Sequence, residues 1–348
     1  MEKISIMNKL IGYEKEIIAD NILSIQINLL NKCTSRCRSC RKYTWPNDTL
    51  DINTIKNVIS VLAKSYGLKT IVLSGGDPVL YPKLLDVIDI CKANDIKCSM
   101  ITTGITNNKE VLDVISNDLY RVHLSLDTID KEMYKYIRGV DAFDIVDKNI
   151  KVISKNRKAK NILPIRLSST ISVMNYDKVY ELYRYARDNG CFINFYLVHT
   201  FEGLYMNDFE LATFYNELSC ICTDERQRGQ IISNARGLYI DYMYGVKHKV
   251  NCTCYIPNIS CVINANGDVY PCCRVFKDNG EYGDQISLSY GNIVGKDEEG
   301  LKEVFDNRLK ISYPIKDNEE CKECGQRYYD MIEHLYKIKT GRKDVLFV

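Results

Sequence analysis

Three cysteines lie close together near the start of the chain, in Cys33-Thr-Ser-Arg-Cys37-Arg-Ser-Cys40. They follow a short apolar run, so we expect one loop to carry three thiols at the end of a strand. Four cysteines close a [4Fe-4S] cluster to outside ligands, whereas three leave one iron free for a substrate or cofactor. Five cations and no acid lie within residues 32–42, which favours thiolates and offsets the negative charge of a cluster. The loop therefore predicts an iron-sulfur site with one open coordination position.

Short apolar runs alternate with longer amphipathic stretches up to about residue 200. The pattern predicts strands at 24–30, 69–74, 96–102, 120–127, 164–173 and 191–198, and helices at 53–66, 83–93, 108–117, 141–156 and 176–189. This alternation requires parallel strands with right-handed crossovers, which either a doubly wound sheet or a complete or partial barrel provides. Both architectures place their chemistry at the carboxyl ends of the strands.

Polar and small residues gather at those predicted strand ends. Gly75-Gly76-Asp77-Pro78 closes the second strand, Thr102-Thr103-Gly104 closes the third, and Ser125 and Asp127 end the fourth. We expect them to lie beside the cysteine loop, because the carboxyl ends of parallel strands meet at one edge of a sheet. This arrangement favours an enzyme.

The Cys33-x3-Cys37-x2-Cys40 loop after a first strand, followed by Gly75-Gly76-Asp77-Pro78 after a second, resembles the radical S-adenosylmethionine (SAM) enzymes over about residues 24–200. The resemblance implies an α/β fold, a partial (β/α)6 TIM-like barrel. It also implies that the three cysteines hold a [4Fe-4S] cluster whose fourth iron binds SAM. It places the methionine amino group at the glycine-rich turn and Asp77. The remaining cofactor-binding residues that it implies are Pro78, Thr103, Ser125 and Asp127, the last two at the ribose, and Arg138 ahead of Gly139.

The loop departs from the family in one position. Ser39 precedes the third cysteine, where family members usually carry an aromatic residue near the adenine, and Tyr43 or Trp45 is the candidate substitute. Other interpretations of the loop are a structural zinc knuckle, unrelated reactive thiols, and an RNA-binding patch of cations and stacking aromatics. Charge compensation for a cluster already accounts for the cations, which argues against a nucleic-acid partner.

A second group of cysteines lies in the tail. Cys254, Cys272, Cys321 and Cys324 supply four thiols around a predicted hairpin at 260–270 that turns at Asn266-Gly267 or Gly267-Asp268. Four thiols close a tetrahedral metal site, and their spacing alone leaves a zinc ribbon and an iron-sulfur cluster as alternatives. Three nearby cysteines are alternative ligands: Cys252, Cys261 and Cys273.

The tail resembles the auxiliary-cluster extension of radical SAM proteins called SPASM, or its shorter form, twitch, over about residues 250–328. Residues 289–293 and 300–309 share the resemblance. The full SPASM pattern needs further cysteines after Cys324 and none follows, so we expect one auxiliary [4Fe-4S] cluster. In some twitch-type epimerases a cysteine near this site returns a hydrogen atom to the substrate radical. Cys273 is the candidate for that role, and a buried spare thiol is the alternative.

Four segments follow from these patterns. They are an N-terminal segment at 1–23, the radical SAM partial barrel at 24–205, a helical connection at 206–250, and a small cysteine-rich twitch/SPASM-like domain with a C-terminal helix at 251–348.

Composition narrows the class of protein. The 47 Lys and Arg against 45 Asp and Glu leave a net charge of +2, too small to attract nucleic acid or anionic lipid over the whole surface. No apolar run approaches the roughly 20 residues of a membrane span. The 15 cysteines without a secretion signal indicate metal or redox chemistry in the cytoplasm.

The resemblance implies reductive cleavage of SAM to a 5′-deoxyadenosyl radical, which takes a hydrogen atom from a substrate. Twitch-type relatives oxidise or epimerise aminocyclitols and sugars, and others modify ribosomally made peptides. About two dozen residues precede the first strand, too few for a peptide-recognition domain, so a small molecule is favoured and a peptide is the alternative. We expect a one-electron donor such as flavodoxin or ferredoxin. A non-enzymatic iron-sulfur or zinc protein that binds RNA is the alternative from a different class.

Overall fold

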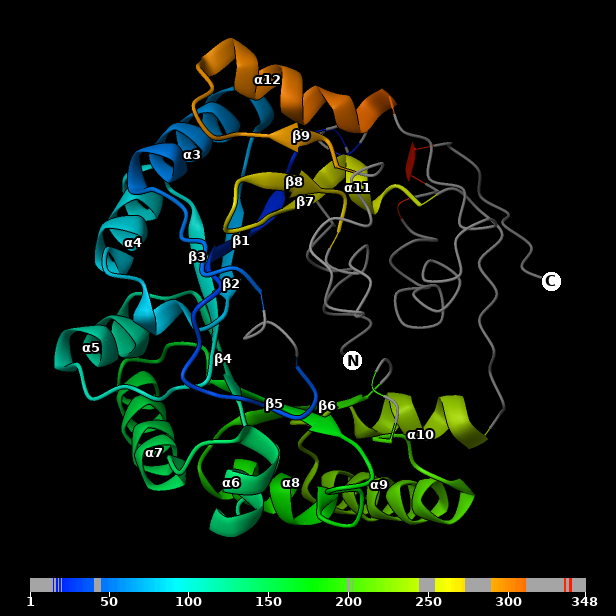
Figure 1. Ribbon diagram of the computed structural model, residues 1–348. Helices are drawn as coiled ribbons and strands as arrows, with labels where there is room; N and C mark the ends of the chain where they lie inside the picture. The colour runs from blue at the N-terminus through cyan, green and yellow to red at the C-terminus, as the bar shows by residue number, and fades with distance from the viewer. Residues whose placement is uncertain are drawn as a thin grey trace.

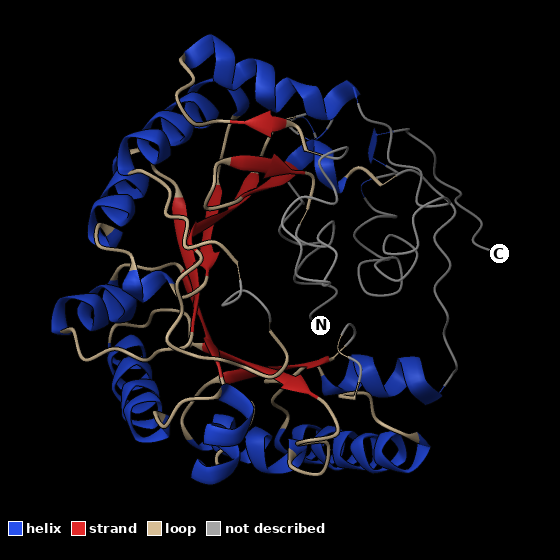
Figure 2. Ribbon diagram, viewed as in Figure 1, coloured by secondary structure: helices blue, strands red, loops and turns tan. Residues whose placement is uncertain are grey.

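A computed structural model gives the architecture of the chain. It describes residues 15, 17, 19, 21–40, 45–198, 201, 203–243, 254–272, 289–310, 335, 338 and 339. Nine strands form one curved, open sheet in the order β6-β5-β4-β3-β2-β1-β7-β8-β9, and helices cover its outer face (Figures 1 and 2). Among these residues, none of the helices combines the length and the apolar character needed to cross a bilayer.

Six parallel strands make up most of the sheet, close to their predicted positions. They are β1 (Ser24–Leu30), β2 (Thr70–Gly75), β3 (Lys97–Thr102), β4 (Arg121–Ser125), β5 (Arg166–Ile171) and β6 (Phe192–Leu197). The helices between them are α3 (Ile52–Tyr66), α4 (Leu84–Ala93), α5 (Lys109–Asn117), α6 (Lys131–Arg138), α7 (Phe143–Ala159) and α8 (Val179–Asp188), with a short 3-10 turn η2 (Pro78–Leu80) after β2. Helix α6 was not predicted, because it has eight mostly polar residues.

Alternation along the strands separates the core from the inner face of the sheet. In β1, Ile25, Ile27 and Leu29 are at most 1% exposed and belong to the hydrophobic core with α3. Gln26 and Asn28 therefore lie on the opposite, inner face, since successive side chains of a strand alternate. The inner face of the partial barrel is thus the polar one.

The predicted hairpin is present, and it extends the barrel sheet. β7 (Ser260–Ile263) and β8 (Asp268–Tyr270) pair antiparallel, and β9 (Gly291–Asn292) continues the sheet. β7 also pairs parallel with β1, with Ile25 opposite Cys261. The Asn28 amide on the inner face donates to Asn264 Oδ1 over 2.8 Å. The boundary predicted at residue 251 therefore falls between two segments that share one sheet.

Helix α12 (Glu298–Asp306), predicted near 300–309, packs on the barrel helix α3, and a short turn η4 (Asn307–Lys310) follows it. The Tyr66 ring meets Phe305 edge-on with 6.2 Å between centroids, and the Tyr66 hydroxyl donates to Asp306 Oδ1 over 2.8 Å. A short helix, α11 (Ile256–Ile259), precedes β7. The tail is therefore joined to the barrel by a helix as well as by the sheet.

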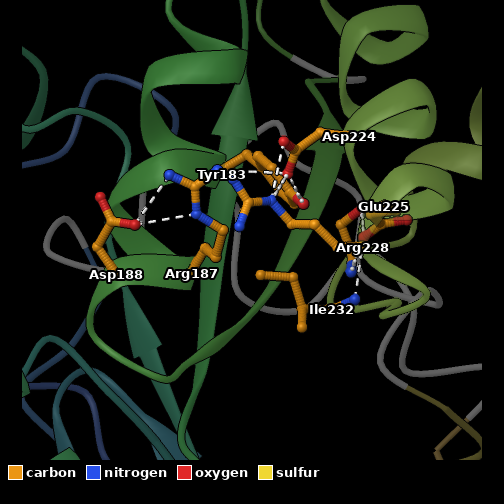
Figure 3. Close-up of polar contacts among 8 residues, drawn as sticks. Tyr183, Arg187, Asp188, Asp224, Glu225, Arg228 and Ile232 are labelled. Carbon is orange, nitrogen blue, oxygen red and sulfur yellow. Dashed lines mark hydrogen bonds and ion pairs between the residues drawn. The ribbon is translucent and has the colours of Figure 1, made fainter.

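The region predicted as a helical connection forms α9 (Asp208–Arg228) and α10 (Ala235–Met243). Two adjacent acidic residues on α9, Asp224 and Glu225, hold this region in place, as Figure 3 shows. Asp224 accepts from the Tyr183 hydroxyl over 2.8 Å and pairs with Arg187 of α8 at 3.3 Å. The buried Glu225 accepts the backbone N–H of Ile232 over 2.9 Å, which fixes the turn after the helix.

Candidate iron-sulfur and SAM site

The cysteine loop follows β1 directly and presents its two faces differently. Cys37 is buried, and Cys33 and Cys40 are half-buried. The neighbouring cations of the loop are exposed: Lys32, Arg36 and Arg38. The thiols of the loop are thus more buried than its cations.

The Gly75-Gly76 turn packs against the backbone at the start of this loop. A Cβ on Gly75 would lie 2.3 Å from the Leu30 carbonyl oxygen, and one on Gly76 would lie 2.1 Å from that of Lys32. The amides of the turn bond the same backbone: Gly76 N–H to Leu30 O over 2.7 Å and Asp77 N–H to Lys32 O over 2.9 Å. Only glycine permits this approach, so both glycines are required to hold the loop, and their predicted contact with SAM stays a prediction.

The C-terminal end of α6 also holds the loop, through backbone hydrogen bonds. The Arg36 N–H donates to the Arg138 carbonyl over 2.8 Å, and the Arg38 N–H donates to that of Ile137 over 3.0 Å. Gly139 ends α6 with φ at +64°, and a Cβ there would lie 2.7 Å from Arg36 O. The Arg138-Gly139 pair thus contacts the cysteine loop, although the helix that positions it was missed.

Asp77 is fully buried at the strand ends. Its Oδ1 accepts from the Thr102 hydroxyl over 2.5 Å, and its Oδ2 accepts from the Thr103 hydroxyl. Burial raises the pKa of this carboxyl above its ordinary value, although the hydrogen bonds from the two hydroxyls oppose the shift. Asp77 also caps η2, which begins at Pro78. Thr102 was expected at these strand ends but was not among the predicted cofactor-binding residues, and its contact with Asp77 adds it to the site. The predicted contact of Asp77 with the methionine amino group stays a prediction.

Asp127 and Arg138 form a buried ion pair with 2.8 Å between Asp127 Oδ2 and Arg138 Nη2. Asp127 Oδ1 accepts the N–H of Thr170 over 2.7 Å, and Arg138 Nη1 donates to Cys37 Sγ over 3.7 Å. Burial raises the pKa of Asp127 above its ordinary value, although the charge of Arg138 and the hydrogen bond from the Thr170 amide oppose the shift. These contacts link both residues to the cysteine loop, and their predicted contacts with SAM are not tested.

Polar side chains line the inner face of β4, β5 and β6: Ser125, Ser168 and Thr170 are half-buried, Asn194 is buried and Tyr196 is exposed. Ser125 lies opposite Ser168, and Ser168 lies opposite Asn194. One layer nearer the strand ends, Thr170 lies opposite Tyr196, and the Asn194 amide donates to the Tyr196 hydroxyl over 3.0 Å. Only Ser125 was predicted to belong to the site, because the others become neighbours through strand register.

The three thiols are suited to binding the iron ions of a cluster. Burial raises the pKa of Cys33 to about 11 and also raises that of Cys37, and neighbouring thiols contribute to both shifts. Ionisation of these thiols is therefore unfavourable unless cations are bound to them. No three His, Cys, Asp or Glu side chains converge on one metal ion within the described ranges. A cubane takes one thiolate per iron and needs no such convergence, so this donor set fits a [4Fe-4S] cluster.

The tail cysteines are described in part. Cys254 and Cys272 are half-buried and flank the hairpin. Cys252, Cys273, Cys321 and Cys324 lie outside the described residues. Cys261, an alternative ligand, is 2% exposed on β7 within the hydrophobic core, and burial raises its pKa to about 12. Its position favours a packing role over ligation.

Comparison with protein families agrees with this geometry. The radical SAM superfamily model matches residues 27–212, and the model of the SPASM iron-sulfur cluster-binding domain matches residues 252–325. The chain belongs to the radical SAM superfamily. It is an enzyme of that superfamily with a C-terminal SPASM domain, so its cofactors are a [4Fe-4S] cluster, SAM and auxiliary iron-sulfur.

Curated relatives named GTP 3′,8-cyclase match about half of the chain. A probable GTP 3′,8-cyclase of Pyrococcus abyssi is 27% identical over 168 residues, covering 47% of this chain and 53% of that protein. A probable GTP 3′,8-cyclase of Methanococcus aeolicus is 30% identical over 183 residues, covering 51% and 59%. The chain thus spans about half the length of the curated relatives it matches.

Solved structures resemble more of the chain at lower identity. AnSMEcpe with bound AdoMet and Cp18Cys peptide has a TM-score of 0.65 at 17% identity, covering 93% of this chain and 92% of that one. Streptococcus suis SuiB bound to precursor peptide SuiA has a TM-score of 0.62 at 18% identity, covering 86% and 68%. These likenesses confirm the predicted partial TIM-like barrel.

Proposed function

We propose that the chain cleaves SAM reductively and removes a hydrogen atom from a polar substrate bound on the inner face of the sheet. The observation that carries this is the Cys33, Cys37 and Cys40 loop, held by close backbone contacts at the carboxyl ends of parallel strands. When bound, the reduced cluster and SAM supply a 5′-deoxyadenosyl radical that takes the hydrogen atom. Cys33, Cys37 and Cys40 would each hold one iron and leave the fourth open to SAM.

The neighbouring residues orient SAM. The carboxylate of Asp77, fixed by the hydroxyls of Thr102 and Thr103, is directed to the methionine amino group. The Gly75-Gly76 turn offers its backbone to the same group, and Ser125 at the end of β4 lies at the proposed ribose position. Rigid positioning of this kind is the contribution that a protein makes to cofactor-driven chemistry.

The inner face indicates the class of substrate. Ser168, Thr170, Asn194 and Tyr196 present hydroxyl and amide groups from adjacent strands, with Tyr196 39% exposed. Such groups suit a substrate rich in hydroxyls or amides, because each buried polar group of the ligand then finds a partner. A small molecule such as an aminocyclitol or sugar fits this description, and oxidation or epimerisation is the proposed outcome.

A ribosomally made peptide is the second candidate. The solved structures that share this fold over most of the chain include SuiB with its precursor peptide and anSMEcpe with a peptide. We propose flavodoxin or ferredoxin as the electron donor and the cytoplasm as the location.

The first experiment is anaerobic reconstitution with iron and sulfide, followed by dithionite and SAM, with 5′-deoxyadenosine measured by mass spectrometry. We expect the product from the wild-type chain and none from Cys37→Ala, which should keep its tail iron. Cleavage by Cys37→Ala would refute the assignment of the first loop, whereas a loaded protein that does not bind SAM would favour the RNA-binding alternative. Deuterated sugars and peptides then separate the two substrate classes by transfer of deuterium to 5′-deoxyadenosine.

The proposed hydrogen donor is tested separately. If Cys273 returns a hydrogen atom, Cys273→Ala should still consume SAM and form 5′-deoxyadenosine in the presence of substrate, but should not release the epimerised product. Normal product formation by this variant would remove Cys273 from the mechanism.

A further inference from the structure

A chain of hydrogen bonds runs from the sheet to one sulfur of the cysteine loop. The backbone N–H of Thr170 on β5 donates to Asp127 Oδ1 over 2.7 Å, and Asp127 Oδ2 lies 2.8 Å from Arg138 Nη2. Arg138 Nη1 then donates to Cys37 Sγ over 3.7 Å. The guanidinium is therefore fixed on one side by a buried carboxylate and directed on the other at a single cluster ligand.

The surroundings make this contact rigid and strong. The side chains of Arg138 and Asp127 are 9% and 2% exposed, so solvent screens their charges weakly. The Arg138 carbonyl also accepts the N–H of Arg36, which holds the loop and the helix end together independently of the guanidinium. Cys33 differs, because its sulfur accepts the neutral backbone N–H of Ser35 over 3.4 Å. The charged donor thus distinguishes Cys37 from Cys33.

We propose that Arg138 is a positioning residue that raises the reduction potential of the N-terminal cluster through its hydrogen bond to the Cys37 sulfur, with Asp127 orienting the guanidinium. Reduction adds one negative charge to the cluster. A fixed positive donor stabilises the reduced state more than the oxidised state, and hydrogen bonds to cluster sulfurs are an established determinant of potential. Arg138 therefore makes the cluster easier for its electron donor to reduce, and this role does not depend on the substrate.

The test measures the midpoint potential of the N-terminal cluster in full-length protein carrying all its clusters, without SAM. Anaerobic redox titration followed by electron paramagnetic resonance gives the potential, and the Cys37→Ala protein supplies the auxiliary signal to be subtracted. In Arg138→Gln we expect a lower potential, seen as about five- to tenfold less reduced cluster at a fixed applied potential. Arg138→Lys should recover only part of the shift, because one ammonium does not span Asp127 and Cys37 as a guanidinium does.

Two variants separate this role from a structural one. Arg184→Gln removes an exposed guanidinium on α8 and should leave the potential unchanged, since water and salt screen it. Gly139→Ala keeps Arg138 but forces a Cβ against Arg36 O, so it should lose iron from this site. The potential is recorded on the loaded fraction of each protein. A wild-type potential in Arg138→Gln, full recovery in Arg138→Lys, or an equal shift in Arg184→Gln would overturn the proposal.

Discussion

Gly76 and Lys32 approach so closely that no side chain fits between them: a Cβ on Gly76 would lie 2.1 Å from the Lys32 carbonyl oxygen. The same oxygen accepts the Asp77 N–H over 2.9 Å, so the turn after β2 and the loop after β1 are joined backbone to backbone. The glycines of this turn therefore act on the cluster through the position of its loop.

Gly76→Ala should displace the cysteine loop and lose most of the iron of the N-terminal site, because the clash is with backbone and no side chain can move to relieve it. Iron and sulfide counts after anaerobic reconstitution measure this. Gly237→Ala on α10 is the matched control, since a Cβ there meets nothing within 4 Å and should leave the iron content unchanged. Full iron loading in Gly76→Ala would show that Gly76 is not required to hold the cysteine loop.

Asp77→Asn tests whether this carboxylate binds SAM. The hydroxyls of Thr102 and Thr103 can rotate to bond the amide, so the fold should survive, while a charged partner for the methionine amino group is lost. A charge-assisted hydrogen bond of ~1.5–3 kcal/mol predicts a Kd for SAM about tenfold or more higher. Anaerobic calorimetry on loaded protein measures the Kd. An unchanged value would leave Asp77 only the task of bonding the two threonines.

The Cys321→Ala, Cys324→Ala double variant tests the tail site. It should lose about four irons per chain, as expected for one auxiliary [4Fe-4S] cluster, and keep the iron of the N-terminal loop. Metal analysis by mass spectrometry, with zinc counted alongside iron, gives the answer. Unchanged iron with loss of zinc would point to the zinc ribbon instead, and Cys261→Ala should change neither metal because Cys261 lies in the core.

Tyr66→Phe tests the attachment of the tail to the barrel. The change removes the hydroxyl that donates to Asp306 and keeps the ring against Phe305, so we expect a loss of ~1 kcal/mol in the free energy of unfolding. Urea denaturation measures it. Tyr136→Phe on α6, where the ring is 51% exposed, should change stability by much less. Equal effects in the two variants would mean that the Asp306 contact adds no stability.

Local patterns in the sequence determined the chemistry of the N-terminal site and most of the barrel. The spacing of Cys33, Cys37 and Cys40 and the Gly75-Gly76-Asp77 turn predicted the family, because metal ligation and a tight turn depend on residues adjacent in the chain. The six strands were found because burial of one strand face leaves a short apolar run.

The tertiary structure alone decided which distant residues meet. The contact of Arg138 with Cys37 spans 101 residues, and it depends on α6, a helix of eight residues that was not predicted although Asp130 and Gly139 cap it. The parallel pairing of β7 with β1 was likewise hidden, because a hairpin pattern specifies its own turn but not the strand that its outer edge will join. Strand register likewise brings Thr170 beside Tyr196, because side chains of parallel strands become neighbours only through the hydrogen bonds between strands.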